Sequence, residues 1–338
     1  MAAIYKSILI FISLYYLIIY NKINRSPTHP AQNLTSSANF AIIGGAAKTT
    51  QVCYGAKNDL TSGEFIMSKK TKEKKTFYYT DELNDDFAGT NIKTRSVDGS
   101  FKFIHKGFLW RAVSFFLYYI VAFPLVLLYE KLILGVKFVN KRALRKYKGQ
   151  AIFIYGNHTG FYDAFTPNLI AFPHRNMIVV SPDTVSIKGL RCIVQMLGAI
   201  PISEGLRGMK GFRECIDYHA SKGAAITVFP EAHIWPYYTG VRPFPDTSFY
   251  YPVKHKAPTF AFFTAYTKPK GLLSFLRKAS ITVYVSDPIF PKDGLSEREM
   301  RKDIRDKAYE FMLEKSKYSD YEAIKYIKLT DECAENAK

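Results

Sequence analysis

The stretch AIFIYGNHTGFYDAF, residues 151–165, contains the change of pattern that decides the fold. Its first five residues are apolar and rich in Ile and aromatic side chains, which is typical of a buried strand. A glycine and an asparagine follow, and such residues favour a turn. The stretch therefore predicts a strand, a turn and the start of a helix, with His158 in the turn and Asp163 in the helix.

The same alternation of strand-like and helix-like segments continues through residues 150–330. Strand-like runs lie at 151–155, 177–181, 199–202, 224–229, 258–263 and 280–285, and candidate helices lie near 161–171, 187–197, 208–221 and 246–255. This order predicts an α/β domain with a largely parallel central sheet flanked by helices. Ser296 and Glu299 form a capping-box pattern that predicts the start of a further helix.

Residues 105–149 predict a membrane-associated helical segment N-terminal to that domain. Residues 112–129 are 18 consecutive residues without a charge, which is about the minimum length for a membrane span. Aromatic residues suit the membrane interface, and Pro124 is expected to kink the helix. We expect a membrane-embedded or membrane-docked helix that continues as a hairpin, and the alternative is a buried core helix. The cations that flank it are Arg111, Lys131, Lys137, Lys141, Arg142, Arg145, Lys146 and Lys148.

Residues 1–104 are expected to form a largely disordered N-terminal extension. The apolar run at 7–20 is short for a membrane span and is closer to a signal sequence or an interfacial anchor. Residues 26–66 are polar and lack a clear period. Met67 begins MSKKTKEKK, which reads like a natural start, so we expect residues 1–66 to be an upstream extension that adds nothing to the chemistry.

The formal net charge of +18 favours anionic partners, such as nucleic acid, phosphate-bearing substrates or an anionic membrane face. Signatures of RNA-recognition, helix-turn-helix and zinc-finger modules are absent from the sequence, so nucleic acid is not an expected partner. The four cysteines form no CxxC pair, which argues against a zinc site or a disulfide framework and fits a reducing compartment.

The pair His158 and Asp163 has the chemistry of a general base with its orienting carboxylate. A carboxylate that bonds one ring nitrogen of a histidine selects the tautomer and stabilises the imidazolium that forms when the other nitrogen takes a proton. A solvated histidine and a helix-capping aspartate explain the bare spacing equally well. Glu231 follows the strand-like run 224–229 and is expected at the same sheet edge. The alternative is that Glu231 only caps a helix or lies in a solvated turn.

Four ordered blocks together resemble the glycerophospholipid acyltransferase family, typified by 1-acyl-sn-glycerol-3-phosphate acyltransferase. The first block of that family, N-H-x4-D, is matched by Asn157, His158 and Asp163. The other blocks correspond to GAIPISE (198–204), FPEAHIW (229–235) and KAPTFAF (256–262). The resemblance covers roughly residues 105–290, with the order and spacing of the blocks correct.

This resemblance implies acyl transfer from acyl-CoA or acyl carrier protein to a hydroxyl of a lipid acceptor, lysophosphatidate or a related lysolipid, in phospholipid biosynthesis. His158 would be the base and Asp163 its orienting group, while backbone N–H groups near the turn are candidate donors to the carbonyl oxygen. The candidate substrate-binding residues are Asn157 and Glu231 within the matched blocks, together with His233 and with Arg207 and Arg242 as possible substitutes for a family cation. The resemblance implies no metal and no bound cofactor, and it places the protein on a membrane surface, at the cytoplasmic face.

The chain departs from the family pattern where the acceptor's phosphate is expected to bind. Glu204 replaces an Arg of the second block, Ala232 and His233 replace the Gly and Thr of the third, and Ile234 replaces the Arg that follows them. Each lost cation would remove charge-assisted hydrogen bonds worth about 1.5–3 kcal/mol. A non-phosphate acceptor therefore stays open, as do a lipid ester or thioester hydrolase and a non-catalytic, membrane-anchored binding protein.

Overall fold

The computed structural model describes residues 75–87, 94, 96–187, 189–271 and 274–329. The apolar run 7–20 and the predicted start at Met67 lie outside the described residues. The chain divides into two units, of which Asp81–Ile324 is the larger. In the smaller unit, β1 (Thr76–Tyr79) pairs in parallel with β9 (Lys325–Lys328), two strands that the sequence did not predict.

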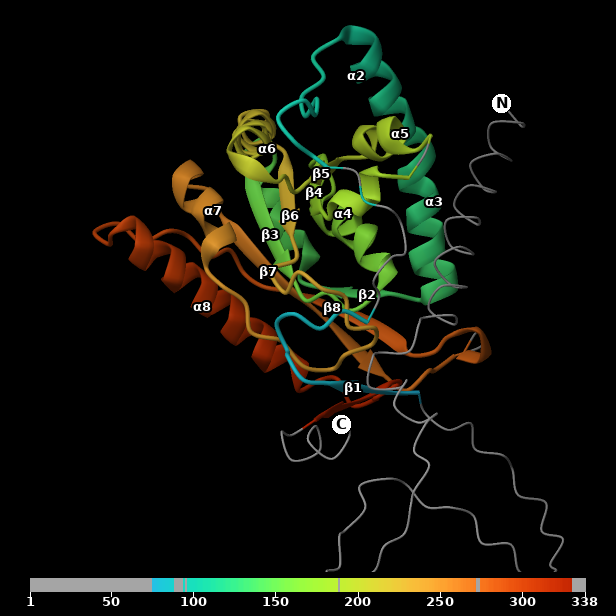
Figure 1. Ribbon diagram of the computed structural model, residues 1–338. Coiled ribbons are helices and arrows are strands. Elements are labelled where there is room, and N and C mark those ends of the chain that lie inside the picture. The colour runs from blue at the N-terminus through green and yellow to red at the C-terminus, as the bar shows by residue number, and fades with distance from the viewer. Residues whose placement is uncertain (1–74, 88–93, 95, 188, 272–273, 330–338) are drawn as a thin grey trace, which may run out of the picture. The chain divides into compact units, whose positions relative to one another are not determined.

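Within the described residues, a seven-stranded sheet forms the centre of the larger unit, in the order β2-β8-β7-β3-β6-β4-β5 (Figure 1). All neighbouring strands are parallel except β7 and β8, so the prediction of a largely parallel sheet is confirmed. The strands are β2 (Lys137–Val139), β3 (Ile152–Gly156), β4 (Asn176–Val180), β5 (Ala199–Pro201), β6 (Ala225–Val228), β7 (Thr259–Thr267) and β8 (Ser280–Val285).

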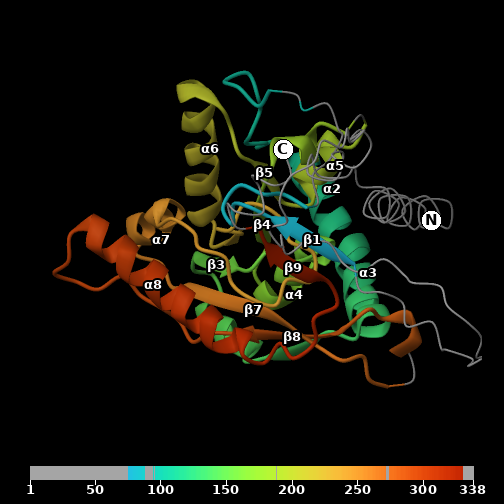
Figure 2. The same ribbon diagram turned by 60° about the horizontal axis from the view of Figure 1, so that its bottom comes forward.

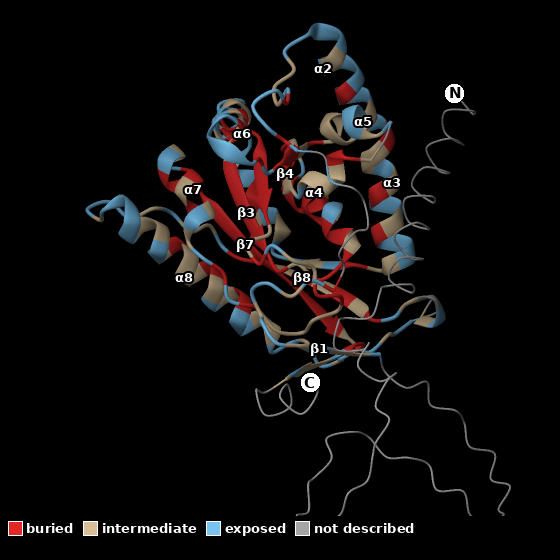
Figure 3. Cartoon of the chain, in the orientation of Figure 1, coloured by how far each residue is buried: buried red, intermediate tan, exposed pale blue. Residues whose placement is uncertain are grey.

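Both faces of the sheet are covered, and the alternation of side chains along β3 shows how. Phe153 and Tyr155 belong to one buried cluster, while Ile152 and Ile154 belong to another on the opposite face. The first cluster is completed by α6 (Gly205–Ala220), α7 (Tyr250–His255) and α8 (Glu297–Ser316), and the second by α4 (Thr166–Ala171) and the 3₁₀ helix Lys141–Tyr147. Burial on both faces explains why these strands read as continuous apolar runs. Figure 3 shows the buried sheet between these layers.

The predicted capping box at Ser296 is confirmed. The Ser296 hydroxyl oxygen accepts a hydrogen bond from the Glu299 N–H at 3.4 Å, and the Glu299 carboxylate accepts one from the Ser296 N–H at 2.8 Å. The helix that begins here, α8, buries Ile304, Ala308 and Met312 and lies along β7 (Figure 2).

A continuous helix spans Phe108–Leu134. It comprises α2 (Phe108–Phe115), a π-helical segment (Phe116–Ala122), α3 (Phe123–Leu128) and a second π-helical segment (Tyr129–Leu134). The predicted hairpin is wrong. The helix ends at Gly135, whose left-handed φ of 66° turns the chain into β2. Residues 137–147 are therefore part of the α/β layers, and the sheet begins before the expected boundary at residue 150.

This helix buries polar side chains and exposes apolar ones, which is the reverse of an ordinary surface helix. Its buried side includes Ser114, Tyr118 and Glu130. These side chains make hydrogen bonds to Met196 O (2.7 Å), Asn168 Oδ1 (3.0 Å) and Thr166 Oγ1 (2.7 Å), respectively. The exposed apolar side chains are Phe108, Leu109, Val113, Phe115, Phe116, Ile120, Leu127, Leu128, Leu132 and Ile133. Only 22% of its most apolar window is buried, which does not fit the alternative of a core helix.

Part of the predicted N-terminal extension packs against the α/β layers. Val97 and Phe101 are buried in a small cluster with Val185. The Ser203 hydroxyl and the Glu204 N–H both donate to Val97 O, the latter at 3.2 Å. The sequence prediction missed this packing because the apolar side chains of 97–104 follow no regular period.

Candidate active site

The described residues place the side chains of His158 and Asp163 in contact at the carboxyl edge of the sheet. His158 lies in the loop after β3, and Asp163 lies in the 3₁₀ helix Phe161–Ala164. The distance between His158 Nδ1 and Asp163 Oδ2 is 2.9 Å. The Asp163 side chain is fully buried, whereas the His158 side chain keeps 18% of its surface exposed. The pair thus has a buried carboxylate and a histidine that solvent and ligands reach.

The Asp163 carboxylate also determines the shape of the loop that carries the histidine. Its Oδ2 accepts hydrogen bonds from the N–H groups of Thr159 (2.7 Å) and Gly160 (2.9 Å). An ionised carboxylate accepts such bonds, and the contact with His158 then assigns the proton to Nδ1. Nε2 is left with its lone pair, as a general base requires.

One ring contact holds the histidine, and the two residues before it in the chain anchor the turn. The His158 ring stacks on Phe229, with 4.3 Å between the ring centres and 18° between the planes. At the end of β3, a Cβ atom added to Gly156 would overlap the ring of Phe262, so the strand requires glycine there. Asn157, a predicted substrate-binding residue, is fully buried and instead bonds β7: its Oδ1 accepts from the Thr264 N–H at 2.8 Å.

Glu231 follows β6 by three residues and reaches the loop after β3, the parallel neighbour of β6. Its Oε2 accepts a hydrogen bond from the His158 backbone N–H at 3.2 Å. The same oxygen lies 3.3 Å from Nη2 of Arg242, and Oε1 accepts from the Arg242 N–H at 3.1 Å. Burial raises the pKa of Glu231, while the Arg242 guanidinium and the two N–H donors oppose that rise.

Arg242 is buried as completely as the carboxylate that it contacts. Its side chain is 0% exposed and also donates to the backbone oxygens of Glu82 and His233. Its guanidinium lies 5.0 Å from the ring centre of Trp235. These contacts use the guanidinium to fasten the loop after β6, which leaves it little capacity to bind a substrate phosphate.

The loop after β6 also pairs with the dyad loop through backbone hydrogen bonds. The N–H of Trp235 donates to His158 O at 3.1 Å, and the N–H of Tyr237 donates to Thr159 O at 2.9 Å. Ala232 and Tyr237 have left-handed φ angles of 64° and 60°. Such angles are costly for side-chain-bearing residues, so the surrounding contacts maintain them.

The sequence suggested that backbone N–H groups near the turn could donate to the carbonyl oxygen of a thioester, and the hydrogen bonds of the loop limit which groups can do so. The N–H groups of His158, Thr159 and Gly160 already donate to Glu231 and Asp163. They are therefore not free to stabilise a developing oxyanion.

A buried hydroxyl cluster that the sequence did not reveal supports the dyad loop. Thr159 Oγ1 lies 2.7 Å from the hydroxyl of Tyr266, which also contacts the hydroxyl of Tyr162. Burial raises the pKa of Tyr266, so its hydroxyl stays protonated and can donate. Tyr162 directly precedes Asp163 in the sequence, but Tyr266 lies on β7 and only the sheet register brings it here.

The remaining predicted site residues lie further from the dyad contacts. Arg207 is exposed in the first turn of α6, and Glu204 is the residue at its N-cap. His233 Nδ1 lies 3.7 Å from Asp86 Oδ2. In the described part of the chain, neither Arg207 nor His233 is hydrogen-bonded to His158 or Asp163. The described residues also contain no group of three or more His, Cys, Asp or Glu side chains that could hold a metal ion.

Residues 135–284 match the model of a family described as Acyltransferase. This segment is similar to the acyltransferase family. The match includes His158, Asp163, Glu231 and Arg242. No curated protein sequence matches the chain. One matching solved structure is the 1-acyl-sn-glycerophosphate (LPA) acyltransferase PlsC from Thermotoga maritima, with 20% identity, a TM-score of 0.39, and coverage of 53% of this chain and 71% of that one.

The buried Glu231–Arg242 pair predicts a large cost in stability for removing the cation alone. We expect Arg242→Met to lower the free energy of unfolding by about 3–5 kcal/mol, because it leaves a buried carboxylate without its partner. Glu231→Gln combined with Arg242→Met should recover much of that loss. Denaturant titration of the purified variants measures both.

Lys254→Met provides the matched control, because Lys254 forms a half-exposed pair with Asp217 at 2.7 Å. Such a pair contributes about 0–1 kcal/mol. Equal losses for Arg242→Met and Lys254→Met would contradict a special structural role of the buried pair.

The left-handed conformation of Ala232 predicts that glycine is better tolerated there. We expect Ala232→Gly to raise the free energy of unfolding by about 1 kcal/mol, because glycine adopts this φ without the steric cost of a Cβ. Ala143→Gly, at a residue with a negative φ, should instead lower it by about 0.5–1 kcal/mol. A loss of stability in both variants, measured by the same titration, would argue against backbone strain at Ala232.

Proposed function

We propose that the protein transfers a fatty acyl group from acyl-CoA or acyl carrier protein to a hydroxyl of a lipid acceptor, with His158 as general base. The observation that carries this proposal is the 2.9 Å contact between His158 Nδ1 and buried Asp163, at the carboxyl edge of the sheet in the segment that is similar to the acyltransferase family. Ligand sites of open α/β sheets lie at that edge.

The proposed reaction has one nucleophilic attack and no acyl-enzyme. His158 Nε2 takes the proton of the acceptor hydroxyl as the oxygen attacks the thioester carbonyl carbon. A C–O bond forms, the C–S bond breaks, and the proton on Nε2 passes to the departing thiolate. Asp163 stabilises the imidazolium between these two proton transfers and keeps its ring oriented.

The dyad proposal predicts a specific loss of turnover. His158→Ala should lower kcat by about 10²–10⁴-fold, because general base catalysis contributes about that factor. Asp163→Asn should lower kcat as well, because the amide neither stabilises the imidazolium nor enforces the tautomer. Product formation from a radiolabelled acyl thioester and a lysolipid measures both effects.

The fold offers a matched control in a second histidine–aspartate contact. His255 Nε2 lies 2.8 Å from Asp217 Oδ1, and the His255 ring packs at 6.0 Å from Phe153. His255→Ala removes an equivalent contact away from the loop after β3. Full activity in His158→Ala, or equal losses in the two histidine variants, would overturn the dyad mechanism.

The proposal includes two candidate classes of acceptor. Lysophosphatidate or a related lysolipid is the acceptor that the family resemblance favours. A second candidate is a lipid hydroxyl without a phosphate, because Glu204 is an acid where the family has a cation and Arg242 is buried against Glu231. Arg207, which is exposed on α6, is the remaining candidate cation of the predicted set.

Competition between acceptors tests this second candidate. A single charge-assisted hydrogen bond to the acceptor phosphate would favour lysophosphatidate over an uncharged monoacylglycerol by about tenfold or more in kcat/KM. If no cation of the site binds that phosphate, we expect the preference to stay below about tenfold. A strong preference for lysophosphatidate, lost in Arg207→Gln, would instead establish the phosphate-bearing acceptor. Thioester cleavage at a rate that no acceptor changes would favour a hydrolase over a transferase.

We also propose that the helix Phe108–Leu134 lies in the surface layer of a membrane, on its cytoplasmic side. Its hydrogen bonds from Ser114 to Met196 and from Thr166 to Glu130 fasten both halves of the helix to the α/β layers. A helix that crossed the bilayer would carry those layers into the hydrocarbon. An interfacial position lets its exposed apolar face enter the membrane while the bonded face stays on the protein.

A further inference from the structure

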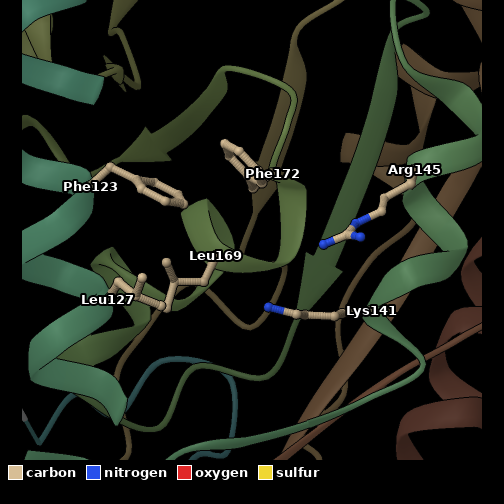
Figure 4. A pocket seen from close by; sticks show the side chains of 6 residues that line it. All are labelled: Phe123, Leu127, Lys141, Arg145, Leu169 and Phe172. Atoms are coloured by element: carbon tan, nitrogen blue, oxygen red, sulfur yellow. The ribbon is translucent and has the colours of Figure 1, made fainter. Parts of the chain in front are cut away.

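A cavity of about 180 Å³ lies beside the long helix, and its lining is mixed in character. Four apolar side chains and two cationic ones surround it (Figure 4): Phe123, Leu127, Leu169, Phe172, Lys141 and Arg145. Among the described residues, no acidic side chain lines it. The combination suits a ligand with an apolar part and an anionic part.

The cavity lies at the other end of the strands from the dyad. Arg145 lies in the 3₁₀ helix that leads into β3, and Phe172 lies in the segment that leads into β4. The hydrogen-bond contact between His174 Nε2 and Tyr147 O, at 2.9 Å, joins these two segments near the amino ends of the strands. His158 follows the carboxyl end of β3, so the cavity is separate from the proposed catalytic edge.

The charges of the two cavity cations are not balanced by an ion pair among the described residues. In the described part of the chain, neither Lys141 nor Arg145 forms an ion pair within 4.0 Å. Lys141 Nζ lies 4.7 Å from the centre of the Phe138 ring, and Lys131 Nζ lies 4.8 Å from the same ring. Burial lowers the pKa of Lys141 and the neighbouring cations Lys131 and Arg145 lower it further, while Glu130 opposes the shift. An anion would relieve this crowding of positive charge.

We propose that this cavity binds one anionic phospholipid of the membrane. Its phosphate would lie against Lys141 and Arg145, and the first part of an acyl chain would lie against Phe123, Leu127 and Phe172. Figure 4 shows the two cationic groups pointing towards the cavity from the same side, opposite the apolar side chains of the long helix. Basic pockets beside membrane-associated helices bind anionic headgroups in this way.

A membrane lipid fits this lining better than free phosphate does. Inorganic phosphate would contact only the cations and would leave the four apolar side chains facing water. Leu127 is 40% exposed and belongs to the exposed apolar face of the helix, beside Leu128. A lipid in the cavity therefore has a continuous apolar path from the protein to the surrounding bilayer. The site does not depend on the proposed acyl transfer.

Photolabelling of the whole protein on vesicles tests the proposal. Phosphatidylcholine vesicles would contain phosphatidylglycerol, a small share of it with a photoreactive group on the acyl chain near the glycerol. Enough vesicles are used to bind every variant completely, so labelling reports the cavity and not membrane attraction. We expect peptide mass spectrometry to find label in residues 123–127 or 169–172, and less label from photoreactive phosphatidylcholine.

Two charge-matched variants separate the cavity from general basicity. Lys141→Gln with Arg145→Gln should lower this labelling by about tenfold or more, because both charge-assisted contacts to the phosphate are lost. Arg142→Gln with Lys146→Gln removes the same charge from exposed neighbours outside the lining and should leave labelling close to wild type. His158→Ala should also retain it, so the lipid site and the catalytic proposal fail independently.

Three results would overturn the assignment. The first is equal loss of labelling in the two charge variants, which would mean general attraction. The second is equal labelling by phosphatidylcholine, which would remove the anionic requirement. The third is absence of label from both segments in the wild type, which would leave the cavity without the lipid.

Discussion

Three hydrogen bonds converge on one buried oxygen atom, Oδ2 of Asp163, and the geometry of the candidate site depends on them. The donors are His158 Nδ1 and the backbone N–H groups of Thr159 and Gly160. Hydrogen bonds to a charged acceptor contribute about 1.5–3 kcal/mol each. The carboxylate that orients the histidine thus also folds the loop that carries it. A substitution at Asp163 therefore changes the tautomer, the ring position and the backbone together, and its effect on activity is a sum of all three.

A second carboxylate joins this loop to its neighbour. Glu231 accepts from the His158 N–H on one side and from Arg242 on the other, so the loops after β3 and β6 form one network. The structure gives the buried Arg242 a different role from the one expected from the sequence. The position of Arg242 in the sequence made it a candidate for binding a substrate phosphate. In the structure it instead contacts Glu231 and backbone oxygens. Under the proposed function, other residues would select the acceptor, and the exposed Arg207 is one that the sequence also indicated.

The sequence predicted the elements whose signals are local. Apolar runs located six of the strands in the central sheet, and the capping box located the start of α8. Contacts between distant residues had no such signal. Tyr266 meets Thr159 only through the pairing of β7 with β3, and the three-residue strand β2 is too short to show a period. The hairpin expectation failed because hydrophobicity does not reveal where a helix turns, whereas Gly135 with its left-handed φ determines that point.

The long helix exposes apolar side chains and buries polar ones, an arrangement that is unfavourable in a soluble protein. Its apolar side chains face outward, while Ser114, Tyr118 and Glu130 make the bonds that fasten it. Glu130 bonds Thr166, which lies three residues after Asp163 in the helix that follows the dyad loop. Displacement of the helix would leave Glu130 and Thr166 as buried polar groups without partners, which is costly. If the helix lies in the membrane interface as proposed, a short chain of bonded residues connects it to the loop that carries His158. The distance of His158 from the membrane plane would then be fixed, and a lipid acceptor would meet the histidine at a constant depth.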